Sequence, residues 1–194
     1  MKLSWVEDAA SQPLDVLTME GVAAIVFCFT VYSFLGWLLE NSYHYFTNRK
    51  FFKENFLVGP FKPMYGFAPV ILVCLISPET SSGTILLLCL FVPSIVEYIS
   101  GALLLKLFHR QWWDYSNTPF QLHGHICLPY SICWVFLSLF CLKWLQPILM
   151  ELYQPIELIW AWTWPAVGVY FLTELILAIR KHLMQDRIQL VGND

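Results

Sequence analysis

Four long apolar runs dominate this sequence and restrict the folds that it can adopt. They occupy residues 21–45, 83–108, 126–145 and 156–179. An α-helix needs about 20 apolar residues to cross the hydrocarbon core of a bilayer, and each run is long enough. Only 13% of the residues are charged, which is about half the share found in soluble domains. The sequence therefore predicts an all-α polytopic membrane helix bundle that lies in the lipid bilayer.

A fifth apolar segment, residues 61–77, is shorter and contains Pro63, Gly66 and Pro69. Pro63 suits the start of a helix, because the missing N–H is harmless there. We expect Gly66 and Pro69 to loosen the helix that follows. The segment could cross the bilayer or be re-entrant. Counted as a span, it brings the total to about five transmembrane helices.

The basic residues orient this arrangement. With five spans, nine of the 11 Lys and Arg residues share one side of the membrane. They are Arg49, Lys50, Lys53, Lys62, Lys106, Arg110, Arg180, Lys181 and Arg187, whereas Lys2 and Lys143 fall on the other side. Because basic loops remain cytoplasmic, we predict an N-terminus outside and a C-terminus in the cytoplasm, in the plasma membrane.

The chain divides into three parts on this basis. Residues 1–20 form an extracytoplasmic tail, residues 21–182 the five-helix membrane domain, and residues 183–194 a cytoplasmic tail. The first part has one lysine and four acidic residues and does not have the pattern of a signal peptide. The six cysteines lie in or beside apolar runs, and we expect them to be small buried hydrophobic residues of helices, without disulfides or a metal.

Three glutamates lie inside predicted spans: Glu40, Glu97 and Glu174. A carboxylate at the centre of a membrane helix costs about 3 kcal/mol. Polar and small residues share their helix faces. One helix face carries Glu40 together with Ser33, Gly36 and His44, and another carries Glu97 together with Ser94 and Gly101. The glutamates should therefore point into the bundle, in its cytoplasmic half. They could be hydrogen-bonded ties between helices, or they could line a pathway for a proton or a cationic solute.

Two loops contain more specialised residues than a connector needs. The first loop contains "FLVGPFKPMYGFAP". Residues of both loops should shape a cytoplasmic mouth: Lys62, Tyr65, Arg110, Asp114, His123, Gly124 and His125. In "QWWDYSNTPFQLHGHICLPYS", Asp114 should close a side-chain-capped turn and Gly124 should permit an unusual backbone angle. The aromatic residues of this second string are expected to form a belt at headgroup level. They are Trp112, Trp113, Tyr115 and Phe120.

A metal or catalytic site in the second string is the less favoured interpretation. The residues that suggest it are His109, Asp114, His123 and His125, but no third ligand has a zinc-like spacing. The chain has no recognisable nucleophile motif. We therefore expect no enzyme activity, no cofactor, no metal and no nucleic-acid partner.

Three strings carry a resemblance to a known family. "FLGWLLENSYHYF", "FLVGPFKPMYGFAP" and "VEYISGALLLKLFHRQWWDYSNTPFQLHGHICLPYSICW" resemble the ABC-transporter permease family of small five-helix membrane proteins, the CmpB type. The match runs from about Phe34 to Trp134, with the patterns GPF-x-P-x-YGF and WDYS…G-x-I-C-L as its most specific parts. The resemblance implies an integral-membrane permease component.

Three functions remain open at this stage. The first is a permease or transporter subunit; because the chain lacks a G-x-x-x-x-G-K-[ST] phosphate loop, a separate cytoplasmic ATPase would drive it. Five spans are few for a whole pathway, so we expect a homo-oligomer, a dimer. The second is a non-catalytic membrane scaffold or accessory subunit. The third is a membrane-embedded enzyme for a lipid-linked substrate, using Asp114, the histidines and Arg110.

Overall fold

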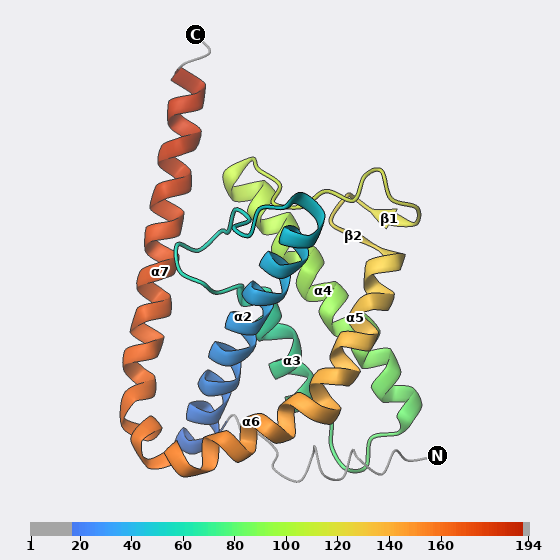
Figure 1. The fold of residues 1–194 in the computed structure, drawn as a ribbon, viewed down its shortest axis with the longest axis vertical. Coiled ribbons are helices and arrows are strands. Elements are labelled where there is room, and N and C mark those ends of the chain that lie inside the picture. The colour runs from blue at the N-terminus through green and yellow to red at the C-terminus, as the bar shows by residue number, and fades with distance from the viewer. Residues whose placement is uncertain (1–16, 192–194) are drawn as a thin grey trace.

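A computed structural model describes residues 17–191, with side chains described as far as residue 185. The chain is mostly helical, as predicted (Figure 1). Its elements follow in this order: α2 (Met19–Asn48), α3 (Pro63–Leu75), α4 (Ser82–Phe108), β1 (Gln121–Leu122), β2 (Ile126–Cys127), α5 (Leu128–Phe140), the π-helical turn η1 (Cys141–Leu145), α6 (Gln146–Tyr153), the 3-10 turn η2 (Gln154–Ile156) and α7 (Glu157–Val191).

Within the described residues, three helical stretches are long and apolar enough to cross a membrane: Met19–Asn48, Ser82–Phe108 and Leu128–Gln185. The third joins the two last predicted spans, which the sequence had suggested were separate. It is bent at η1 and η2, so that α5 descends, α6 crosses the lower end and α7 rises again (Figure 1). Pro147 and Pro155 lie at these bends, where each removes a backbone donor and disfavours a straight helix.

α3 begins beside the middle of α2. Pro63 is its first residue, as expected, and the backbone N–H of Lys62 donates to the Ser33 carbonyl at 2.9 Å. Ser33 lies about 22 Å before the end of α2 at Asn48, at 1.5 Å per residue. With 13 residues, α3 is roughly 20 Å long and shorter than the hydrocarbon core. A re-entrant segment would return to the end from which it enters. Here the chain instead runs from the loop after α2 at the top of Figure 1 to the α3–α4 turn at the bottom, so the segment passes through the bundle and is helical only in its second part.

The expected loosening of α3 does not occur. The helix continues through Gly66 and Pro69 without a break. Gly66 instead lets α3 approach α2, because a Cβ at this position would overlap Ser33 Oγ and the Phe29 ring. Gly36 of α2 faces Tyr65 in the same way. Small residues at both contact points bring the two backbones close, as in other membrane helix pairs.

The cysteines follow the prediction only in part. Cys28, Cys89, Cys127 and Cys141 are buried, whereas Cys74 and Cys133 are exposed. Cys127 belongs to β2 and not to a helix, so the span predicted over residues 126–145 began two residues too early, since α5 starts at Leu128. The sequence pattern cannot distinguish an inner from an outer helix face when both faces are apolar.

The basic loops lie at one end of the bundle. The loop after α2, the β-hairpin and the rising end of α7 are all at the top of Figure 1, while the α3–α4 turn and α6 are at the bottom. Lys2 and the predicted N-terminal tail up to residue 16 lie outside the described residues. The predicted C-terminal tail is helical as far as Val191.

Candidate functional site: a buried carboxylate cluster

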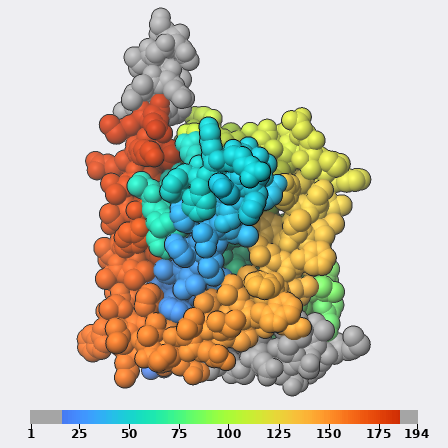
Figure 2. Space-filling model, viewed as in Figure 1, coloured from blue at the N-terminus to red at the C-terminus, as the bar shows by residue number. Residues whose placement is uncertain are grey.

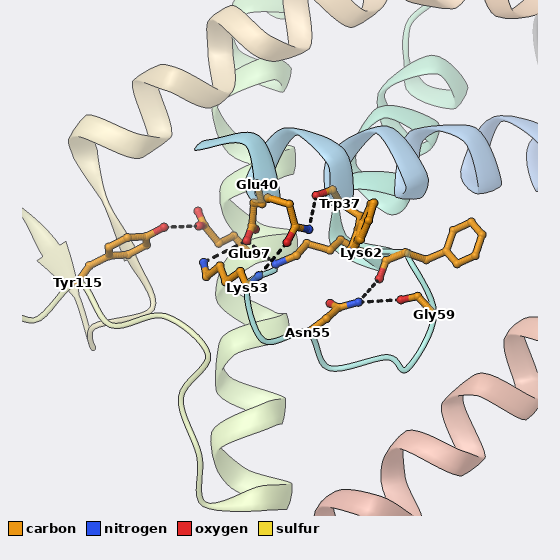
Figure 3. A network of polar contacts seen from close by, with 10 residues as sticks. Trp37, Glu40, Lys53, Asn55, Gly59, Lys62, Glu97 and Tyr115 are labelled. Carbon is orange, nitrogen blue, oxygen red and sulfur yellow. Dashed lines mark hydrogen bonds and ion pairs between the residues drawn. The ribbon is translucent and has the colours of Figure 1, made fainter. Parts of the chain in front are cut away.

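Glu40 is the centre of an ion-pair set in the interior. Its Oε2 accepts from Lys53 Nζ at 3.1 Å and also pairs with Lys62 Nζ (Figure 3). The Glu40 and Lys62 side chains are only 17% and 12% exposed. A buried charge is tolerated when it is paired and hydrogen-bonded. The two lysines come from the chain between α2 and α3, so the set holds that segment against α2.

Glu97 is held differently. It lies on α4 and is 3% exposed. The Tyr115 hydroxyl donates to its Oε1 at 3.0 Å, and Trp134 Nε1 donates to its Oε2 at 2.9 Å. Both donors are neutral, and they come from the loop before the hairpin and from α5. Glu97 therefore connects three parts of the chain through hydrogen bonds, without the cation that Glu40 has.

The two carboxylates belong to one cluster. Tyr65, on the first turn of α3, lies against Glu40 and close to Glu97, and its ring packs on Trp134 with centroids 5.0 Å apart. Figure 3 shows Glu40, Glu97, Lys53 and Tyr115 side by side. Burial and the nearby Glu97 raise the pKa of Tyr115, so its phenol stays protonated and can donate. We call Glu40, Lys53, Lys62, Tyr65, Glu97, Tyr115 and Trp134 the carboxylate cluster.

Two asparagines position the segment that supplies the lysines. Asn41 donates to the Trp37 carbonyl at 2.7 Å and accepts from the Lys53 backbone N–H at 2.8 Å. Asn55 donates to the carbonyls of Gly59 and Phe61 at 3.0 and 2.9 Å (Figure 3). Because these bonds satisfy backbone groups of an irregular segment, the segment can lie against the helices at this depth.

Glu174 lies apart from the cluster. Its Oε2 accepts from the Gly59 backbone N–H at 2.7 Å, and Tyr170 of the same helix lies beside it. A Cβ at Gly59 would come within 2.5 Å of the Tyr170 hydroxyl. Glu174 is 8% exposed and ties α7 to the segment before α3. Of the three predicted glutamates, the structure thus brings together Glu40 and Glu97.

The other predicted interior residues have separate partners. Ser33 is buried against Gly66. Ser94 Oγ donates to Ser131 Oγ at 3.0 Å, across to α5. His44 Nδ1 lies 2.5 Å from the Lys50 carbonyl near the end of α2. The three residues share helix faces with the glutamates, as predicted. Each of them nevertheless contacts a group outside the carboxylate cluster.

The second loop forms a folded hairpin. Leu122 pairs with Ile126, and the turn between them includes His123 and Gly124, both with positive φ. Asp114 Oδ1 accepts from the Ser116 N–H at 2.8 Å, which confirms the predicted turn. Bonds from the Ser116 side chain and backbone lower the pKa of Asp114. A Cβ at Gly124 would come within 2.8 Å of Asp114 Oδ1. Both the positive φ and this close contact therefore favour glycine at the position.

The histidines and Arg110 do not converge with Asp114 on one site. His123 Nδ1 lies 2.9 Å from the Tyr98 hydroxyl, while His125 is buried against Gly101 of α4. Arg110 pairs with Glu54 and lies 5.4 Å over the Trp112 ring. Within residues 17–191, no three His, Cys, Asp or Glu side chains are grouped so that they could hold a metal ion.

The aromatic belt at headgroup level stays a prediction, but three of its four rings also pack inward. Trp112, Trp113 and Tyr115 are only partly exposed, and Trp112 packs on Phe56 and on His182 of α7. Phe120 alone of the four is strongly exposed, at 82%. The three inward rings found partners on α4, α7 and the α2–α3 segment, and such tertiary contacts have no sequence signature.

Sequence reasoning missed several residues of the site. Trp134 was one aromatic residue in an apolar run, Tyr115 was assigned to the belt, and Lys53 was counted only as a charge. His182, which bonds the Phe56 carbonyl at 3.0 Å, was not singled out. The spacing of Tyr115 and Trp134 from Glu97 is 18 and 37 residues, so no local pattern could have indicated them.

The sequence matches the model of a known family. A family model described as "Putative ABC-transporter type IV" matches residues 27–179. The chain belongs to this family, ABC_trans_CmpB. No curated protein and no solved structure matches the chain. The family match covers the whole carboxylate cluster and Glu174, and extends well beyond the strings that carried the resemblance.

The ABC-transporter type IV family name and the long apolar helices agree with each other. The family name indicates a relation to ABC transporters, and the apolar helices indicate a membrane protein.

Proposed function

We propose that this chain is the membrane-spanning permease component of a transporter in the plasma membrane, with the carboxylate cluster as its polar interior. The N-terminus lies outside and the C-terminus in the cytoplasm, because this orientation places the basic loops on the cytoplasmic side. Glu40 and Glu97 then lie in the cytoplasmic half of the membrane. Glu174 fixes α7 to the segment before α3.

The observation that carries this proposal is the environment of Glu97. It lies about 16 Å along α4 from Phe108, which is several turns inside the helix, and it is almost fully buried. A carboxylate held by two neutral donors can gain a proton or accept a cation without breaking an ion pair. A carboxylate that serves only as a tie between helices would be better compensated by a cation, as Glu40 is.

The short helix α3 supports the same proposal. Transporters often build their sites at discontinuous helices near the middle of the membrane, where free backbone groups meet the solute. Here α3 begins beside the middle of α2, and its first turn carries Tyr65 into the cluster. Hence the cluster lies at the break between an irregular segment and a helix.

ATP hydrolysis would come from a separate subunit, since the sequence contains no phosphate loop. We propose that this subunit docks at the end that carries the α2–α3 segment, the hairpin and the end of α7. A homodimer would complete the pathway between two copies. A membrane scaffold is the alternative; it would use the same loops and tolerate changes at Glu97.

The test is to isolate the full chain from its native membrane in mild detergent and to identify the proteins that accompany it. We expect an ATPase subunit in a fixed molar ratio. The reconstituted complex should then lose most of its ATPase activity with Glu97→Gln, and keep it with Glu151→Gln, an exposed position on α6. Equal recovery of both variant complexes by gel filtration serves as the folding control.

Two results would reject the proposal. A chain that is recovered alone, or only with itself, excludes the ATP-driven permease. A complex in which Glu97→Gln retains full ATPase activity excludes a functional role for Glu97 and favours the scaffold.

A further inference from the structure

A lateral groove separates α2 from α5. It has a volume of about 280 Å³, and α3 forms its floor. The side chains that line it are mainly apolar, among them Leu35, Leu39, Pro69, Leu137, Cys141 and Leu145. In the space-filling view it lies between the blue α2 and the yellow-orange α5 (Figure 2). Leu39 and Phe140 at its edges are 47% and 49% exposed, so the groove is open to the side.

The size of the groove favours an alkyl chain as its occupant. An α-helix with its side chains is about 10–12 Å wide, and the space is too small for one from a second copy. Both walls belong to helices that are long and apolar enough to cross a membrane. The open side therefore faces the hydrocarbon of the bilayer, where acyl chains are the molecules available to enter.

A preference among lipids must come from the polar end of the groove. An acyl chain loses no water when it moves from the bilayer into an apolar groove, so burial alone selects no particular lipid. Tyr65 and Trp134 line the groove and belong to the carboxylate cluster on their other side. The groove therefore ends at the charged interior.

The charge at that end favours an anion. Lys53 and Lys62 share the single carboxylate of Glu40, so this ion-pair set by itself carries one positive charge in excess. Glu97, the other acid of the cluster, accepts from Tyr115 and Trp134 and forms no ion pair with either lysine. The Lys53 side chain is 36% exposed and keeps donors free beyond the one that it gives to Glu40. A phosphate is a suitable acceptor for such a lysine.

We propose that the groove binds one acyl chain of an anionic phospholipid, which enters sideways from the bilayer and places its phosphate at Lys53. This lipid would be the ligand class of the permease interior. The inference rests on the proposed function in that it assigns a ligand to the same cluster.

The experiment uses the full chain in nanodiscs that contain a phosphatidylglycerol with a diazirine on one acyl chain, or the matching phosphatidylcholine. After irradiation, mass spectrometry should find adducts on Leu137 and Cys141 in the groove and few on Phe136, which is 69% exposed on the same helix. Phosphatidylglycerol should label the groove at least about 5-fold more than phosphatidylcholine, which corresponds to about 1 kcal/mol.

Two variants and a control sharpen the result. Ser138→Phe fills the groove from α5 and should reduce groove labelling by at least about 5-fold. Ile132→Phe adds a similar ring on the exposed face of α5 and should not. Lys53→Gln should equalise labelling by the two lipids while adducts at Leu137 remain, and this variant keeps the test decisive if Ser138→Phe fails to fold.

Even labelling around α5, or equal labelling by both lipids in the unmodified chain, would each overturn the inference. Those outcomes are separate from the test of the permease itself. If the ATPase subunit co-purifies and Glu97→Gln abolishes its activity while labelling is unselective, the proposed function stands and only the lipid is wrong.

Discussion

Substitutions in the Glu40 ion-pair set should differ sharply in cost, although they remove members of the same contact. Glu40→Gln leaves Lys53 and Lys62 next to each other without their shared carboxylate. Lys62→Met leaves Glu40 with Lys53, whose Nζ is 3.1 Å away. The structure therefore predicts that loss of the acid is more damaging than loss of either base.

The magnitudes follow from burial. Removal of one partner from a buried ion pair costs about 3–5 kcal/mol, and Glu40→Gln should lie in this range because two cations remain. Lys62→Met should cost roughly 1–2 kcal/mol, since it removes one charge-assisted hydrogen bond of two. For a chain of this size, these free energies correspond to reductions in Tm of about 6–20 °C and about 2–8 °C respectively.

Thermal unfolding of the purified chain in detergent, followed by tryptophan fluorescence, measures both values. The double variant Glu40→Gln/Lys62→Met should be more stable than Glu40→Gln alone, because it removes one of the two uncompensated lysines. The coupling free energy must then exceed the cost of Lys62→Met alone, and we expect about 2–3 kcal/mol. If Glu40→Gln changes Tm by less than Lys62→Met does, or if the two effects simply add, our description of the cluster is wrong.

Two further changes test the packing around the cluster. Gly36→Ala should reduce stability by about 1–3 kcal/mol, because the added Cβ overlaps the Tyr65 side chain. The control is Gly168→Ala on α7, where a Cβ meets nothing within 4 Å; it should be neutral or stabilise by up to about 1 kcal/mol. Equal Tm values for the two variants would contradict the close approach of α2 and α3. Trp134→Phe removes one of the two donors to Glu97 and should cost about 1.5–3 kcal/mol in chemical denaturation, whereas an unchanged midpoint would show that Glu97 does not need this bond.

Local features of the fold could be predicted from neighbouring residues. Pro63 begins α3 and Asp114 closes a turn, because each acts on its own backbone or on that of a residue two positions away. Gly124 adopts the predicted positive φ for the same reason. The bends at η1 and η2 also had a local signal in Pro147 and Pro155, which lie between the last two long apolar runs.

The partners of the glutamates could not be predicted in this way. Helical periodicity indicates that Glu40, Glu97 and Glu174 share faces with small and polar residues, but it contains no information on the element that packs against each face. Glu174 meets the backbone of Gly59, 115 residues away in sequence. His44 lies on the face of Glu40 and still bonds the Lys50 carbonyl instead.

The sequence by itself determined that this chain is a bundle of apolar helices with its basic loops at one end, because hydrophobic length and charge distribution act on each segment independently of its neighbours. The tertiary structure decided that Glu40 has two lysines and that Glu97 has a phenol and an indole. It also decided that α2 and α5 stay apart around a groove. These features depend on which helix faces meet, and a carboxylate in a low-dielectric interior takes its properties from the groups that this packing brings within hydrogen-bonding distance.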